Sequence, residues 1–244
     1  MRNIDSYTHT RGESVYLDDI PEIAGTLNAA VYGSPEAHGI IKQLHLDDAL
    51  AVKGVVKILT NKDIPGKNQI GGIVKDEPLL ADGVVHFNGM PVAIVVAENA
   101  DAAHEAVKKI KIDIEPLPVV TLARVAQQNG ALIVPPRTFK IGDSQSAFAQ
   151  CKYIFEGIAE TNGQEHLYIE TQGAYAIPVE NGAIKIYSST QGPTAVQKHC
   201  AEVLDVPMHK VEIDTTRLGG GFGGKEDQAT AWAIFCGLAA YLLG

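Results

Sequence analysis

The sequence has few of the residues that mark metal sites and disulfide frameworks. It contains only three cysteines, Cys151, Cys200 and Cys236, and they form no Cys-x-x-Cys pair. This spacing excludes the usual iron–sulfur and zinc motifs, and it predicts buried free thiols in a reducing compartment. No His-Glu-x-x-His pattern occurs either, so the common zinc-peptidase motif is absent.

Long hydrophobic runs and a secretory signal are also missing. The most apolar segment, residues 229–243, is shorter than the roughly 20 residues of a membrane span. It therefore predicts a buried helix, and the polar start of the chain has no signal peptide pattern. We expect a soluble cytoplasmic protein. A helix that is apolar on all sides must be covered, so we also expect a fragment, or a subunit whose partner supplies the cover.

Basic charge is scarce. Twenty Lys and Arg residues stand against 29 Asp and Glu residues, which gives a net charge of -9. This balance argues against a nucleic-acid surface, and the interspersed charges argue against an acidic tail. The length of 244 residues allows one large or two ordinary domains, and an apolar fraction of 45% suffices for a buried core.

Hydrophobic periodicity predicts an α+β fold. In the first part of the chain it predicts strands at 29–33, 39–46, 55–59, 90–97 and 111–115 and helices at 47–51 and 101–109. The pattern lapses at 126–140, which has loop chemistry and predicts a linker. In the last part it predicts strands at 151–160, 174–178, 182–188 and 211–214 and helices at 143–149, at 193–204 and from near Lys225.

A glycine run, RLGGGFGGKED at 217–227, lies between a predicted strand and a predicted helix. Backbone N–H groups at such a junction can bind an anion, so we favour a ligand contact over a tight turn where two backbones cross. The run fits the dinucleotide fingerprint, but no acidic residue follows at the usual distance in a strand–helix–strand unit. It also departs from the P-loop, because Glu226 occupies the Ser or Thr position.

Three further features are candidates for function. Glu226 is either a carboxylate favoured by the helix dipole or a pocket-edge group that binds a polar substrate. Residues 161–171 concentrate Gln, Glu, His and Tyr. Residues 188–193 form a strand exit and a helix cap, where the Gln191 amide can donate to an oxo group.

Together these segments resemble one family. GQEHLYIET, STQGP and LGGGFGGKED, in that order, resemble the molybdenum-binding subunit of the xanthine dehydrogenase / aldehyde oxidase family. The segments at 12–21, 35–39 and 63–66 are similar to the start of the α/β-hammerhead domain of that family. The resemblance implies a hammerhead domain at 1–125, a linker at 126–140 and the truncated N-terminal part of a mixed α/β molybdopterin-binding domain at 141–244.

The resemblance also implies roles for four residues. Gln191 matches the glutamine that hydrogen-bonds the oxo group of molybdenum, and so lies near the metal without ligating it. Phe222 and Gly223 match residues that line the metal through backbone contacts. Glu226 matches the glutamate that binds the purine ring in xanthine dehydrogenases, where aldehyde oxidases usually lack an acid. The implied cofactors are molybdenum-molybdopterin in this chain and 2Fe-2S and FAD on partner domains or subunits.

The implied activity is hydroxylation of a purine such as hypoxanthine or xanthine, with water as the oxygen source. The catalytic base of the family lies in a later part of its subunit, so we expect this chain alone to be inactive. The implied partners are the C-terminal remainder of the subunit and the Fe-S and FAD subunits. The alternatives are a hydroxylase of aldehydes or other N-heterocycles, a non-catalytic scaffold or partner-docking module, and a nucleotide-binding protein.

Overall fold

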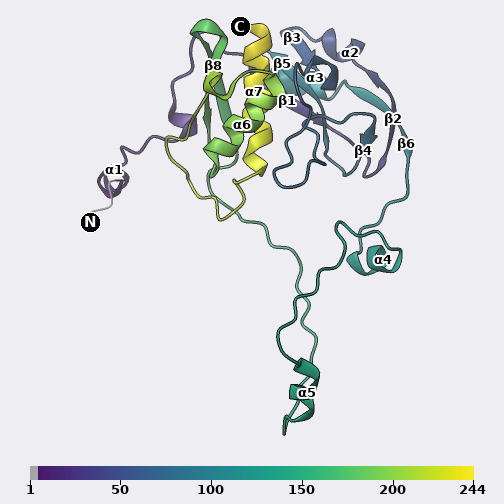
Figure 1. The fold of residues 1–244 in the computed structure, drawn as a ribbon. Coiled ribbons are helices and arrows are strands. Elements are labelled where there is room, and N and C mark those ends of the chain that lie inside the picture. Colours follow the sequence, from purple (N-terminus) through teal and green to yellow (C-terminus); the bar gives the residue numbers. More distant parts are fainter. Residues whose placement is uncertain (1–4) are drawn as a thin grey trace. The chain divides into compact units, whose positions relative to one another are not determined.

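The computed structural model describes residues 5–244 (Figure 1). The described chain divides into two compact units. The larger unit comprises residues up to 118 together with 166–244, and the smaller unit comprises residues 119–165. Both the hammerhead-like and the glycine-rich parts of the sequence therefore belong to the larger unit.

The first sheet of the larger unit has three antiparallel strands in the order β1-β5-β3. Their bounds are β1 (Asn28–Gly33), β5 (Pro91–Ala97) and β3 (Val55–Leu59). Helices α2 (Asp47–Leu50) and α3 (Ala100–Val107) connect this sheet to the next. The Asn99 side chain caps α3 by accepting a hydrogen bond from the Ala102 amide at 2.9 Å.

The central position of β5 in its sheet explains why its sequence is continuously apolar. Ala93 and Val95 on one face belong to a buried cluster with α3, while Ile94 and Val96 on the other face belong to a second cluster. Because both faces are covered, the strand shows an unbroken apolar run rather than alternation. The predicted central strand at 90–97 is confirmed.

The second sheet has the antiparallel order β4-β2-β6. Its strands are β4 (Val84–Val85), β2 (Gly39–His45) and β6 (Lys111–Pro116). A small cluster that includes Val85, Met90 and Val92 packs against the apolar side chains of β2 and β6. The clean alternation predicted for 111–115 is observed as alternating exposed and half-buried residues.

The third sheet, in the order β7-β8-β9, carries the glycine-rich part of the chain. Its elements are β7 (Ala174–Val179), β8 (Ala183–Ser188), α6 (Pro193–Leu204), β9 (Val211–Asp214) and α7 (Gln228–Leu243). Strands β8 and β9 pair in parallel and α6 connects them, whereas β7 pairs with β8 antiparallel. The last helix begins at Gln228, three residues later than predicted, because the glycine-rich turn extends to Asp227.

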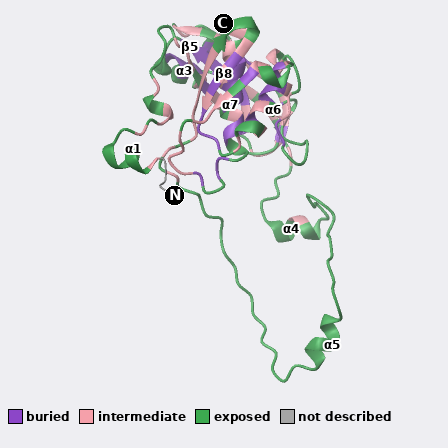
Figure 2. Cartoon of the chain, turned by 60° about the vertical axis from the view of Figure 1, so that its left-hand side comes forward, coloured by how far each residue is buried: buried purple, intermediate pink, exposed green. Residues whose placement is uncertain are grey.

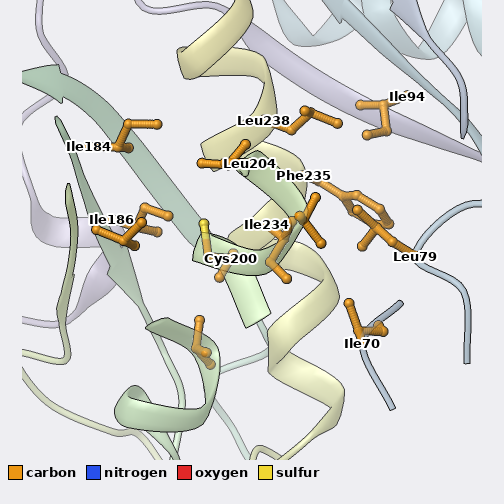
Figure 3. Close-up of a cluster of buried hydrophobic side chains, with 14 of the residues drawn as sticks. Ile70, Leu79, Ile94, Ile184, Ile186, Cys200, Leu204, Ile234, Phe235 and Leu238 are labelled. Carbon is orange, nitrogen blue, oxygen red and sulfur yellow. The ribbon is translucent and has the colours of Figure 1, made fainter. Parts of the chain in front are cut away.

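One buried cluster joins the first and third sheets. Figure 3 shows Ile94 of β5 beside Leu238 of α7, with Ile186 of β8 and Leu204 of α6 in the same cluster. All four of these residues are 0% exposed. Helix α7 is therefore buried as predicted, on the side that faces this core, while Trp232 is exposed.

The smaller unit contains two short helices, α4 (Ala123–Gln128) and α5 (Ser144–Ala149), and is mostly exposed (Figure 2). The helix predicted at 143–149 is observed as α5, and the Asp143 side chain caps it. The strand predicted at 151–160 is wrong, because these residues form no regular secondary structure. A strand needs a neighbour to pair its backbone groups, and within the described residues no strand pairs with this segment. The domain boundaries predicted at 125 and 140 remain predictions.

The N-terminal helix α1 (Ser6–Arg11) has no buried residue. A hydrogen bond of 2.6 Å from the Arg217 guanidinium to the Asp5 carboxylate joins this end of the chain to the start of the glycine run. Among residues 5–244, no helix is both long and apolar enough to cross a membrane.

Candidate cofactor-binding site

The glycine run forms an irregular loop between β9 and α7. Gly220 and Gly223 have φ angles of 104° and 90°, which favour glycine, and Phe222 has a φ of 52°. The side chain of Phe222 is 74% exposed. The loop therefore presents the Phe222 ring and the backbone of Gly223 to the surroundings, whereas Gly221 and Gly224 are buried.

Part of the glycine requirement comes from the protein itself. A Cβ at Gly221 would lie 2.5 Å from the Oε1 atom of Gln191, and one at Gly224 would lie 2.6 Å from the Tyr168 ring. Both distances are too short for any other residue without a shift of the neighbour. The close approach predicted from the sequence is thus made at these two positions by protein side chains rather than by a ligand.

Gln191 is fixed to this loop by its side-chain oxygen. Oε1 accepts hydrogen bonds from the Gly223 amide at 3.0 Å and the Lys225 amide at 3.2 Å. Two N–H donors require the oxygen, so the orientation of the amide group is determined. Gln191 is an exposed residue, and within residues 5–244 no hydrogen bond involves its Nε2 atom, so this nitrogen remains a free donor.

The backbone also joins the end of β8 to the end of the loop. The Lys225 carbonyl accepts hydrogen bonds from the Gln191 amide at 2.8 Å and from the Thr190 hydroxyl at 3.2 Å. Thr190 in turn accepts a bond from the Gly192 amide at 3.0 Å, next to the proline that begins α6. The two predicted segments, STQGP and the glycine run, therefore meet through direct contacts.

Three successive loop amides are unpaired within the described residues, one of them in the buried Gly221. Gly220, Gly221 and Phe222 donate no hydrogen bond within the part of the chain that the structure describes. Successive free N–H groups in a loop with alternating backbone conformations form an anion-binding arrangement. Gln191 Nε2 is a further unpaired donor next to this loop, and N–H groups of this kind can bind oxo or phosphate oxygens.

Glu226 lies beside this loop without serving as a helix cap. Asp227 occupies the N-cap position of α7, and no side chain caps that helix. Glu226 is exposed, and its carboxylate has no hydrogen-bond partner among residues 5–244. Its backbone oxygen would lie 3.4 Å from a Cβ placed on Gly192, so it neighbours the Gln191 segment. The carboxylate is available to a ligand.

An ion pair next to the loop was not predicted from the sequence. Lys225 is 0% exposed, and its Nζ atom lies 3.0 Å from Oε2 of Glu170. The same Nζ lies 4.8 Å from the centre of the Tyr168 ring, a cation–π distance. Because Lys225 is used inside the protein, it is not free to bind phosphate as a P-loop lysine would. The sequence offered one signal for this pair: a lysine lies in the glycine run and a carboxylate, Glu170, lies in the candidate segment 161–171.

The cysteines do not provide metal ligands. Burial raises the pKa of Cys200 to about 12 and that of Cys236 to about 11, so both stay protonated at neutral pH. All three cysteines are free, but the prediction of buried thiols is wrong for Cys151, which is exposed. Within residues 5–244 no group of three or more His, Cys, Asp or Glu side chains gathers as a metal site. The donor set around the loop fits a cofactor that carries its own metal ligands and offers oxygens to N–H groups.

A cavity of about 870 Å³ lies elsewhere in the larger unit. Residues of β7, the end of α7 and the segment from Leu17 to Ala29 line it, and none of the four candidate site residues does. This cavity is therefore distinct from the glycine-rich loop.

Two family models assign the chain to a class of proteins with a hammerhead domain and a molybdopterin cofactor-binding domain. The family model of the aldehyde oxidase and xanthine dehydrogenase a/b hammerhead domain matches residues 11–118, and that of the molybdopterin cofactor-binding domain matches residues 125–244. The chain belongs to the molybdenum hydroxylase family of aldehyde oxidases and xanthine dehydrogenases. The predicted family and fold class are thereby confirmed.

Individual relatives agree with this assignment. The chain is 36% identical to a xanthine dehydrogenase of Emericella nidulans, in an alignment that covers 98% of this chain. It is 34% identical to an indole-3-acetaldehyde oxidase of Zea mays, in an alignment that covers 100% of this chain. It covers only 18% and 19% of those two proteins. An aldehyde oxidoreductase from Desulfovibrio gigas superposes with a TM-score of 0.84 at 26% identity, over 97% of this chain and 29% of that chain.

Proposed function

We propose that this chain forms the first part of the molybdenum subunit of a purine hydroxylase, which oxidises a substrate such as hypoxanthine or xanthine with oxygen from water. The observation that carries the proposal is the fixed Gln191 amide beside three free loop amides. The molybdenum cofactor, when bound, would supply oxygen activation and take up the substrate's electrons. Gln191 Nε2 would donate to an oxo group, and the backbone of Phe222 and Gly223 would line the metal.

The substrate assignment rests on Glu226. Its exposed, unpartnered carboxylate can accept hydrogen bonds from ring N–H groups of a purine. An aldehyde offers no such donors, so an acid at this position favours a heterocycle. The relatives include both xanthine dehydrogenases and aldehyde oxidases, and hydroxylation of an aldehyde or another N-heterocycle is the alternative.

The proposal requires further polypeptide. The chain spans less than a fifth of the length of the curated relatives it matches, and the catalytic base is assigned to none of its residues. Apolar side chains in the smaller unit, such as Ile133, Phe139 and Phe155, are at least 87% exposed and suit a covering partner. We propose the C-terminal remainder of the subunit as that partner, with 2Fe-2S and FAD groups on further domains or subunits. The free cysteines support a cytoplasmic location.

Metal analysis tests the function. The chain should be co-expressed with a polypeptide that matches the remainder of the subunit, purified as a complex and analysed for molybdenum and for xanthine oxidation. We expect about one molybdenum per complex and turnover of xanthine, and neither property in the chain alone. A complex without molybdenum would refute the cofactor role. A metal-free, inactive complex that still captures Fe-S and FAD subunits would support the scaffold alternative.

Replacing Glu226 by valine tests the substrate. In the assembled enzyme we expect kcat/KM for xanthine to fall by a factor that corresponds to about 1–3 kcal/mol, the value of one hydrogen bond to a charged group. Steady-state kinetics with xanthine and with an aromatic aldehyde measure the change. Glu180→Val, at an exposed carboxylate outside the site, is the control. Unchanged kcat/KM for xanthine in the Glu226 variant would remove the purine assignment.

A further inference from the structure

The ion pair of the half-buried Glu170 and the buried Lys225 ties both ends of the glycine loop to one point. Oε2 of Glu170 accepts hydrogen bonds from the Gly219 amide at 2.8 Å and from Lys225 Nζ at 3.0 Å. The Glu170 amide also donates to the Gly219 carbonyl at 3.2 Å. A single carboxylate oxygen thus links the first glycine of the loop to the residue that follows its last glycine.

The same lysine sets the position of Gln191. Its backbone amide donates to Gln191 Oε1, and its carbonyl accepts from the Gln191 amide. The side chain of Lys225 is therefore bonded to Glu170, while its backbone bonds to both the side-chain oxygen and the backbone amide of Gln191. Movement of Lys225 would move the amide group whose Nε2 atom remains free.

The surroundings of the pair leave the lysine little freedom. Tyr168 lies against the Nζ atom, and Gln172 donates to both the Tyr168 hydroxyl at 2.9 Å and the Gly224 carbonyl at 2.8 Å. The second oxygen of Glu170, Oε1, is buried and has no hydrogen-bond partner. The contacts of the Glu170 carboxylate with the loop are therefore made by Oε2 alone, which reaches both the Gly219 amide and Lys225 Nζ.

We infer that Glu170 and Lys225 are positioning residues, which hold the glycine loop and the Gln191 amide in the orientation that receives the cofactor. They act through Gln191 and the loop backbone and need not touch the cofactor. The inference rests on the proposed function. It is tested by a measurement that needs no molybdenum, so its failure can be told apart from a failure of the cofactor assignment.

The test uses the 244-residue chain with the variants Lys225→Met, Glu170→Gln and the double variant. Hydrogen exchange followed by NMR reports the Gly223 amide, which bonds to Gln191, and the Ala103 amide in α3 as a measure of global stability. We expect each single variant to speed exchange at Gly223 by about tenfold or more through local opening. Lys185→Met, which breaks an ion pair of β8 and β9 outside the loop, is the control and should leave Gly223 unchanged.

The double variant separates positioning from a purely structural role. Each single variant leaves one charge of the pair without its partner, which should lower protection at Ala103. The double variant removes both charges, so protection at Ala103 should recover toward that of the unmodified chain. Exchange at Gly223 should stay fast, because the link to Lys225 Nζ is still absent. Recovery of Gly223 together with Ala103 would overturn the inference, and so would equal effects of the Lys185 control. If a single variant fails to fold, the double variant still decides between these outcomes.

Discussion

Replacing Gly221 by alanine is expected to strip the assembled enzyme of most of its molybdenum. The new Cβ would lie 2.5 Å from Gln191 Oε1 and 2.6 Å from its Cδ, so the side chain must leave its position. It would lose the hydrogen bonds from the Gly223 and Lys225 amides. At about 1 kcal/mol for each bond, a cost of about 2 kcal/mol follows, and the free donor at Nε2 is misdirected as well.

Molybdenum content per complex and xanthine kcat/KM measure this effect. Gly157→Ala is the matched control, since a Cβ there meets no atom within 4 Å and its φ angle is not positive. We expect the control to retain full molybdenum and the Gly221 variant to lose it, with both chains folded by circular dichroism. Normal molybdenum content in the Gly221 variant would show that the position of Gln191 does not govern cofactor binding.

Replacing Leu238 by alanine is expected to lower the free energy of unfolding by about 2–5 kcal/mol, the range for a fully buried leucine. Leu238 is 0% exposed and belongs to the cluster that also contains Ile94 of β5 and Ile186 of β8. Because this cluster joins the hammerhead strands to the cofactor-binding part, we expect one cooperative transition that includes both. The substitution in α7 should therefore also reduce the protection of β5 amides.

Urea unfolding followed by circular dichroism, with hydrogen exchange at Val95, checks this prediction. Leu132→Ala is the matched control, because Leu132 is 49% exposed and lies in the smaller unit. It should change stability by less than about 0.5 kcal/mol, as is usual for surface positions. Separate transitions of the two family regions, with Val95 unaffected by the α7 substitution, would contradict the shared core.

The regular elements followed from local patterns. Strand β5 and helix α6 lie within one or two residues of their predicted bounds, because a covered strand and an amphipathic helix leave distinct periodicities. The segment 151–160 shows that an apolar pattern alone does not predict a strand. Its apolar residues favour a strand, but a strand also needs a paired neighbour, and hydrophobicity does not supply one.

The candidate site was only partly predictable. The order of three short segments identified the family, and with it Gln191, Phe222, Gly223 and Glu226 as site residues that remain to be tested. The contact of Gln191 with the loop was expected only through that resemblance. No periodicity shows that a side-chain oxygen accepts from two loop amides, since this depends on how the end of β8 meets the start of α7.

The sequence by itself determined the fold class, the family and the positions where backbone must remain bare. Only the tertiary structure decided what lies against that backbone. Glu170 and Lys225 are 55 positions apart, and their pairing depends on the course of the chain between them. An apolar pattern likewise states that a face is buried but not against which partner. Only the tertiary structure shows that α7 and β5 belong to one hydrophobic core.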